Sequence, residues 1–267
     1  MEKMKANIRL SVQLIRRSKG IGFLALLMLI LVSQARADSL VVNGGFESTT
    51  NGAGQLGYNT NATGWTISGG YTFLYAPGTA DTSNAALGQY GINPLWAPDN
   101  FGGSLPSTSS IPTYFTSPDG GNFVAQDSDF QPAPLQQTIT GLNAGDTYTV
   151  GFWWAAAQQY NFAGPTTEGW NVSLGEQTQS TTVYDNPYQG FSGWMYQSFN
   201  FTADGSSDVL SFAAYGTPGG EPPFSLLDGV TMQDDSSPTP EPGSFPLLFT
   251  GMIGFLALLA SRKRLIA

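Results

Sequence analysis

The sequence predicts an all-β protein whose working part is one β-sandwich domain, residues 38–233. The clearest sign is a strict alternation of apolar and small or polar residues from Thr147 to Ala155. A period of two places alternate side chains on opposite faces of a strand. The residues expected on one face are Tyr148, Val150, Phe152 and Trp154. Thr149, Gly151 and Trp153 are expected on the other.

Two further observations support the same fold class. Trp170, Val172 and Leu174 recur in phase, which predicts a second strand with one apolar face. Turn-forming residues separate such runs, as in residues 141–146 and residues 218–220. No helical periodicity occurs between residues 38 and 244. Short strands joined by glycine-rich turns are typical of a sandwich.

One stretch departs from this pattern. Residues 77–118 are rich in Gly, Pro, Ser and Asn but contain Trp96, Tyr114 and Phe115. Long irregular segments inside a compact domain are functional or disordered, and disordered segments are poor in aromatics. The stretch is therefore expected to be an insertion that packs against the domain.

The charges are segregated. All 10 Lys and Arg residues lie before residue 38 or after residue 261, whereas every one of the 19 acidic residues except Glu2 lies between. The domain is thus strongly acidic. Nucleic-acid binding is excluded, because phosphate contacts need cations. The chain has no Cys, so disulfides do not stabilise the fold.

The N-terminus has the features of a secretory signal peptide, residues 1–37. A basic segment precedes an apolar run from Ile21 to Val32, and Ala35-Arg36-Ala37 matches an A-x-A cleavage site. The sequence therefore predicts export. Arg16-Arg17 is also compatible with a twin-arginine signal.

The C-terminus predicts a membrane element in three parts: a Pro-rich linker at residues 234–244, an apolar helix at 245–261 and a basic tail at 262–267. Positive charges stay on the cytoplasmic side, so the domain is expected to face outwards. An ordinary single-pass anchor fits as well.

Pro240, Glu241 and Pro242, followed by the apolar stretch and the basic cluster, resemble the PEP-CTERM sorting signal. This resemblance implies a Gram-negative bacterium that makes exopolysaccharide. It also implies an exosortase-type membrane protease as partner, which would process the chain near this motif and leave the domain at the cell surface or outside the cell.

The domain itself resembles galactose-binding-like jelly rolls, which include several families of carbohydrate-binding modules. The segments that carry the resemblance are residues 40–47, 135–154, 194–201 and 227–231, together with Trp65. Residues 117–124 also resemble ectodomains that often precede PEP-CTERM signals. The resemblance implies a jelly-roll sandwich and a sugar-binding role.

The chemistry open to the domain is narrow. Without His, Cys, Lys or Arg between residues 38 and 261, it has no residue pair for nucleophilic catalysis and no zinc site built on His or Cys. Glycoside hydrolysis needs only two carboxylates. The candidates are Asp127, Asp129, Glu168, Glu176 and Glu221, and their spacing singles out no pair. We expect a non-catalytic protein.

Calcium is the cofactor that the carboxylates suit, since Ca²⁺ prefers oxygen ligands. The jelly-roll resemblance implies a structural calcium held by Glu47 and Asp228, with backbone carbonyls near Asn43 as further ligands. Ordinary hydrogen bonding of both acids is the alternative. Asp127 and Asp129 form a D-x-D pair that suits a second ion.

Aromatic residues, 13% of the chain, are the other resource. Exposed aromatic rings stack on the apolar faces of sugars. Trp153 is the first candidate, because it opposes the predicted core face and adjoins the small Gly151. Trp170 and Trp194 are expected to extend the platform, with Tyr160 and Tyr196 next. Core packing is the alternative for each.

Three functions remain. The first is a non-catalytic surface or matrix protein that binds exopolysaccharide, with neutral glycans favoured because uronic-acid polymers are repelled unless calcium bridges them. The second is a structural or adhesive protein without a sugar site. The third is a glycosidase with a carboxylate pair.

Overall fold

The computed structural model describes residues 39–81, 93–97 and 115–235. These parts fall within one compact unit, residues 38–237. The predicted signal helix, the Pro-Glu-Pro motif at residues 240–242, the helix at 245–261 and the basic tail lie outside the described residues. Within the described ranges, no helix is long and apolar enough to cross a membrane.

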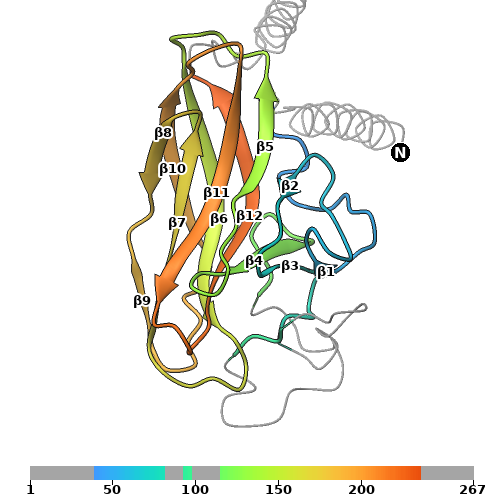
Figure 1. Cartoon of the computed structure of the whole chain (residues 1–267), viewed down its shortest axis with the longest axis vertical. Coiled ribbons are helices and arrows are strands. Elements are labelled where there is room, and N and C mark those ends of the chain that lie inside the picture. Colours follow the sequence, from blue (N-terminus) through green and yellow to red (C-terminus); the bar gives the residue numbers. More distant parts are fainter. Residues whose placement is uncertain (1–38, 82–92, 98–114, 236–267) are drawn as a thin grey trace, which may run out of the picture. The chain divides into compact units, whose positions relative to one another are not determined.

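In the described residues, twelve strands form two six-stranded sheets, and every pairing between these strands is antiparallel (Figure 1). The first sheet contains, in spatial order, β1 (Gly54–Gln55), β3 (Thr72–Tyr75), β4 (Phe123–Asp127), β12 (Pro223–Asp234), β6 (Thr147–Gln158) and β10 (Met195–Thr202). The second contains β2 (Thr66–Ile67), β5 (Leu135–Thr140), β11 (Ser207–Thr217), β7 (Thr166–Leu174) and β8 (Gln177–Ser180), with β9 (Tyr184–Asn186) also paired to β7.

The described part of the chain is therefore all-β, as predicted. Strands that follow one another in sequence lie alternately in the two sheets, from β4 to β7 and again from β10 to β12. This crossing pattern is the one expected of a jelly-roll sandwich.

The main hydrophobic core lies between the sheets. The predicted inner face of β6 is confirmed, because Tyr148, Val150, Phe152 and Trp154 are all buried in this core. Trp170 and Phe212 face them from β7 and β11, and the Phe212 ring lies edge-on to Phe152 with centroids 5.2 Å apart.

A second hydrophobic cluster covers part of the opposite face of the first sheet. It combines outward residues of β3, β4, β6 and β12 with residues of the irregular segment. Its members from that segment are Ala80, Leu95, Ala97 and Phe115. Trp96 is also buried, and its indole N–H donates to the Phe162 carbonyl at 2.7 Å. The described parts of the irregular segment thus pack against the sheet, as its aromatic content predicts.

β12 contains a bulge that orders its surroundings. The register with β6 shifts between Asp228 and Thr231, and Gly229 takes a φ of 59°. The displaced Val230 N–H donates to the Gly44 carbonyl at 3.0 Å. The N-terminal segment therefore docks on the last strand.

Gly44 fits this contact because it has no side chain. A Cβ built there would lie 1.8 Å from the Val230 carbonyl oxygen. We expect Gly44→Ala to lower the free energy of unfolding by about 1–3 kcal/mol, the cost of overpacking. Urea unfolding of the full chain measures this.

Gly205→Ala is the matched control, since a Cβ there would meet only the Ser207 carbonyl oxygen, at 3.9 Å. Its effect is expected within about 0.5 kcal/mol. Equal stability of the two variants would show that the N-terminal segment is not held at the bulge.

Candidate functional site

Trp153 lies on the outer face of the first sheet, where alternation along β6 places it. Its cross-strand neighbours are Tyr196 on β10 and Asp228 on β12. The Trp153 ring is half-buried and meets the Tyr196 ring with centroids 5.2 Å apart, at 63°. Tyr196 is 57% exposed. We call Trp153 and Tyr196 the aromatic pair.

Gly151 was expected to leave the Trp153 ring accessible, but the Tyr196 side chain fills the space above Gly151. A Cβ on Gly151 would lie 2.2 Å from the Tyr196 hydroxyl oxygen, so the Tyr196 side chain crosses Gly151. Gly151 makes room for Tyr196 and does not leave Trp153 open. Tyr196 is therefore the more accessible ring of the pair.

Polar side chains lie on the same outer face along β6, β10 and β12. The Thr149 hydroxyl lies 3.0 Å from the Asn200 carboxamide oxygen and 2.7 Å from an Asp235 carboxylate oxygen. Closer to the aromatic pair, the Thr231 hydroxyl donates to the Gly151 carbonyl at 3.3 Å. The face thus combines an exposed ring with hydroxyl and amide groups.

Trp170 is not part of this face, which corrects the expectation for that residue. It is fully buried between the sheets, and its indole N–H donates to the Leu226 carbonyl at 3.1 Å. Trp170 shares the phase of Val172 and Leu174, so all three point into the main core. No ring face of Trp170 is open to a sugar.

Trp194 is partly a packing residue and partly a surface residue. It is half-buried, and its ring packs edge-on against Phe123 of the second cluster with centroids 5.5 Å apart. It precedes Tyr196 by two residues and lies on the same side of the sheet, at the margin of the aromatic pair. The Tyr160 ring packs against the Trp96 ring, with centroids 4.4 Å apart.

Two acidic residues, Asp119 and Asp228, lie next to the aromatic pair. Asp119 and Asp228 both face Gly45, because a Cβ there would lie 2.8 Å from Asp119 Oδ2 and 3.9 Å from Asp228 Oδ1. Glu47 is close enough for its charge to raise the pKa of Asp228. We call Glu47, Asp119 and Asp228 the carboxylate cluster. The sequence predicted the first and third members together and missed Asp119.

Asp228 is the buried member of the cluster. Neither of its side-chain oxygens has a hydrogen-bond partner within the described residues. Burial is the main cause that raises its pKa, to about 8. The Ser117 hydroxyl and the Gly229 amide lie near enough to lower the pKa, although neither makes a hydrogen bond of normal geometry. A buried acceptor without a partner is costly, so this carboxyl needs a proton or a cation.

The other expected ligands are occupied or dispersed. The Asn43 carbonyl already accepts the Trp65 indole N–H at 3.0 Å and the Phe46 N–H at 3.1 Å. Glu47 accepts the Asn122 N–H at 2.6 Å. In the part of the chain that the structure describes, no three acidic side chains converge closely enough to enclose a metal ion.

Asp127 and Asp129 have a local structural role. Asp127 is buried, and one of its oxygens accepts the N–H groups of Asp129 at 3.0 Å and Phe130 at 2.9 Å. This arrangement closes the turn after β4. The D-x-D pattern is thus explained by the turn.

Glu168 is a fully buried carboxyl at the polar end of the space between the sheets. The Thr166 hydroxyl donates to one of its oxygens at 2.5 Å, while the other has no partner among the described residues. Burial raises the pKa of Glu168 to about 8, and Thr166 and Asn186 offset this only in part. The side chain is therefore neutral near pH 7.

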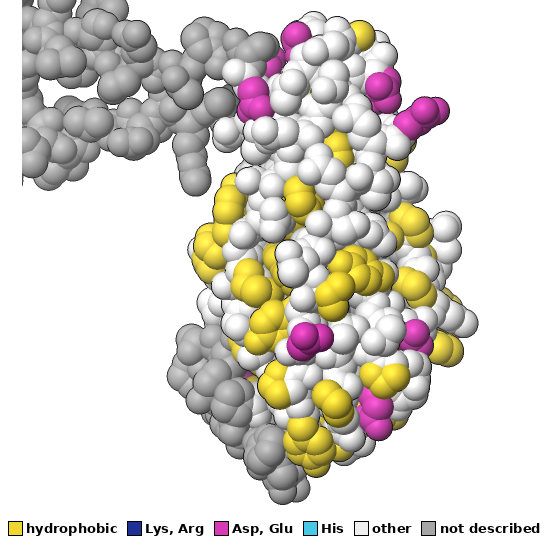
Figure 2. Space-filling model, turned by 90° about the vertical axis from the view of Figure 1, so that its left-hand side faces the viewer, with side chains coloured by type: hydrophobic (Ala, Val, Ile, Leu, Met, Phe, Trp, Pro, Cys, Tyr) yellow, Lys and Arg dark blue, Asp and Glu magenta, His cyan; other side chains and the backbone are white. Residues whose placement is uncertain are grey.

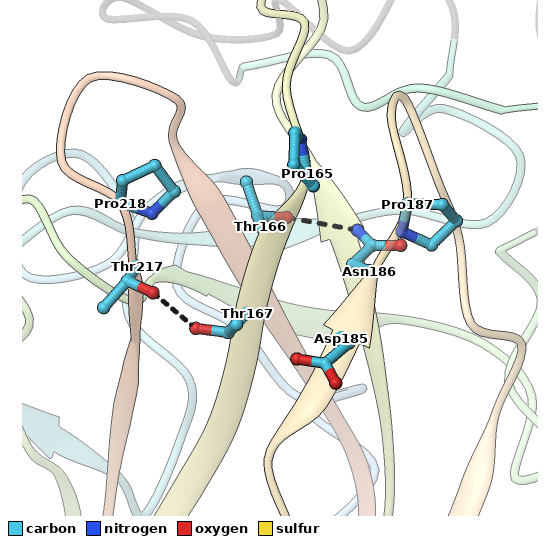
Figure 3. A pocket seen from close by; sticks show the side chains of 8 residues that line it. All are labelled: Pro165, Thr166, Thr167, Asp185, Asn186, Pro187, Thr217 and Pro218. Carbon is cyan, nitrogen blue, oxygen red and sulfur yellow. Dashed lines mark hydrogen bonds between the residues drawn. The ribbon is translucent and has the colours of Figure 1, made fainter.

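A surface pocket of about 400 Å³ opens in the second sheet where β7 begins and β9 and β11 end (Figure 3). Its lining residues are Pro165, Thr166, Thr167, Asp185, Asn186, Pro187, Thr217 and Pro218. The Thr167 and Thr217 hydroxyls bond to each other at 2.8 Å. No aromatic residue lines this pocket, and neither does any of the five candidate glycosidase acids.

The exposed surface reflects the segregated charges. Among the described residues on the face shown in Figure 2, acidic and apolar side chains are interspersed, and no basic side chain appears. An acidic surface without compensating cations attracts counterions and repels polyanions.

No protein-family model and no curated protein matches the sequence. Several solved structures show a distant similarity. The module TmCBM61, solved in complex with β-1,4-galactotriose, is 15% identical, with 74% of this chain and 100% of the module covered and a TM-score of 0.36. The CBM22-1 xylan-binding domain of Paenibacillus barcinonensis Xyn10C is 12% identical, with 75% and 97% covered and a TM-score of 0.36.

The enzymatically active domain of tailspike protein 4 from bacteriophage CBA120 is 13% identical, with a TM-score of 0.35. The similarity covers 73% of this chain but only 21% of the tailspike chain. All three TM-scores lie below 0.5, so the similarity assigns no ligand to this chain.

The buried carboxyl predicts a pH dependence of stability. The folded state keeps the Glu168 proton up to about pH 8, whereas the unfolded chain releases it near the ordinary value of 4.5. The contribution of Glu168 to the free energy of unfolding is therefore present in full below pH 4.5. It falls by up to about 1.4 kcal/mol per pH unit above that value and is lost once the pH has risen through 8. Urea unfolding from pH 5 to pH 9 should show this decline, and Glu168→Gln should make it shallower.

Glu176→Gln serves as the control, because this acid is exposed in the turn between β7 and β8. It should leave the pH dependence as in the wild type. If Glu168→Gln also left it unchanged, Glu168 would not be the buried neutral acid described.

Proposed function

We propose that this protein is an exported, non-catalytic carbohydrate-binding protein that contacts extracellular polysaccharide through the aromatic pair. The observation that carries the proposal is the exposed Tyr196 ring, which packs against Trp153 on a part of the sheet face that also carries hydroxyl, amide and carboxylate groups. A pyranose ring has an apolar C–H face and a polar rim, and this surface offers a partner for each.

The positions of the carboxylates favour binding over hydrolysis. Of the five candidate acids, Asp127 and Glu168 are buried, and Asp127 is committed to a turn. Glu221 accepts the Ala163 N–H at 2.8 Å. Hydrolysis requires two carboxyls on either side of an accessible glycosidic bond, about 5–10 Å apart. None of the five acids is a cross-strand neighbour of Trp153, whose partners are Tyr196 and Asp228.

A structural calcium ion is part of the proposal. Asp228 would hold it with Glu47, the pair that the sequence predicted, or with Asp119, which faces Gly45 as Asp228 does. The support is the buried, unpartnered Asp228 in a domain without basic side chains. When bound, the ion would supply the positive charge that the cluster lacks and link the first described segment to the last strand.

The first test is glycan binding. The full chain should bind neutral oligosaccharides on a glycan array weakly, with a Kd on the order of 10–1000 μM, as expected of a shallow and solvent-exposed contact. Tyr196→Ala and Trp153→Ala should each weaken binding about tenfold or more, because stacking is lost. Titration calorimetry with the best array ligand measures the change.

Tyr58→Ala is the matched control, since Tyr58 is 61% exposed and lies outside the aromatic pair in sequence and sheet position. It should leave the affinity unchanged. Failure of the wild type to bind any glycan would favour a structural or adhesive role. A large drop in melting temperature for Trp153→Ala would show that this ring serves packing.

Export and anchoring complete the proposal. The chain would be cleaved after Ala37 and retained in the membrane through residues 245–261. An exosortase-type protease would then process it near Pro240-Glu241-Pro242, which would place the domain at the cell surface. The support is the confinement of all basic residues to the two ends of the chain. Mass spectrometry of cell-associated and released protein should find the new N-terminus at Asp38. Intact residues 1–37 on the accumulated protein would contradict this.

A further inference from the structure

The aromatic pair and the carboxylate cluster adjoin each other on the outer face of the first sheet, and they meet at Gly229. A Cβ built on Gly229 would lie 3.0 Å from Trp153 Cδ1 and 3.0 Å from Asp119 Cβ. The Trp153 and Asp119 side chains therefore both pack beside Gly229 in the β12 bulge. A ligand that stacks on the aromatic pair comes within reach of the cluster.

The cluster contains a buried carboxyl whose oxygens have no hydrogen-bond partner among the described residues. Asp228 is fully buried with both oxygens unpartnered, and Asp119 approaches the same glycine that Asp228 faces. No Lys, Arg or His occurs between residues 38 and 261. A buried carboxyl without a partner must carry a proton or bind a cation, and a bound cation would also offset the charge of the exposed Asp119.

The protein does not complete a coordination shell by itself. Ca²⁺ takes 6–8 oxygen ligands, and within the described residues no three acids converge to enclose an ion. Asp119 is exposed, unlike Asp228, and it lies on the side of the cluster nearest Trp153. A cation held by Asp228 and Asp119 would therefore need further oxygen ligands, which a bound glycan can supply.

We infer that the carboxylate cluster and the aromatic pair form one composite site, in which a divalent cation held by Asp228 and Asp119 binds the carboxylate of a uronic-acid residue. A neighbouring sugar ring of the same polysaccharide stacks on Tyr196. The inference rests on the proposed sugar-binding role of the aromatic pair. It assigns acidic polysaccharide as the cation-dependent ligand class, in addition to neutral glycans.

Charge explains why the cation decides the ligand class. The acidic surface repels a polyuronate at long range, so without an ion only neutral glycans approach the aromatic pair. With an ion in the cluster, the local charge beside Trp153 is reduced, and the uronate carboxylate becomes a ligand. Calcium should therefore change which glycans bind.

The experiment is an array of neutral and uronic-acid oligosaccharides probed with the full chain in CaCl₂ and in chelator. We expect neutral glycans to bind in both conditions. Uronic-acid oligosaccharides should bind in CaCl₂ and weaken about tenfold or more in chelator, the size of a typical coupling between two ligands. Thermal unfolding in parallel should show that chelator lowers the melting temperature.

Three variants make the test specific. Asp119→Asn should lose the calcium-dependent binding of uronic-acid oligosaccharides, whereas Asp129→Asn, a change at an exposed acid on a different loop, should keep it. Asp228→Asn should abolish the response of the melting temperature to chelator, with Glu47→Gln as a milder second variant. The melting temperature of each variant shows that it folds.

The outcomes separate the two proposals. Binding of neutral glycans without any calcium-dependent binding of uronic-acid glycans overturns the composite site and leaves the proposed function intact. Uronic-acid binding that is equal in CaCl₂ and chelator also overturns it. Absence of binding to every glycan in both conditions overturns the proposed function, and the composite site with it.

Discussion

The bulge in β12 is the constraint on which the candidate site depends. It shifts the register at Asp228, turns Val230 towards the Gly44 carbonyl and leaves Gly229 as a bare backbone position beside Trp153. The N-terminal segment also binds the regular part of the strand, where the Met232 N–H donates to the Ser39 hydroxyl at 3.1 Å and the Met232 carbonyl accepts the Leu40 N–H at 2.9 Å. Because the bulge exists, the first segment, the loop before β4 and the middle of β6 meet on one face of the sheet.

Much of the sandwich was predictable because a strand obeys a strict period of two. The alternation from Tyr148 to Trp154 gave the inner face of β6 correctly and placed Trp153 outside. The same rule applied to β7 makes Trp170 a core residue in phase with Val172, so the expectation that it binds sugar was wrong. Phase within a strand is a stronger guide to exposure than residue type.

The remainder depended on contacts distant in sequence. Asp119 belongs to the loop before β4, and no local sequence pattern reveals where this loop lies. Glu168 shares the inward phase of Trp170, yet a lone acid suggests a solvated residue. Its burial follows from Thr166 and Asn186, which line the same polar end of the sheet interface. Alternation predicts which way a side chain points and does not predict what meets it.

The central claim is that a glycan contacts the outer face of the first sheet at Trp153, and indole N–H signals in two-dimensional NMR test it most directly. The chain has 6 Trp residues, and single Trp→Phe variants assign their signals. During titration with a bound oligosaccharide, the account predicts the largest shift at Trp153 and none at the buried Trp170. An unmoved Trp153 signal under saturating ligand would contradict it.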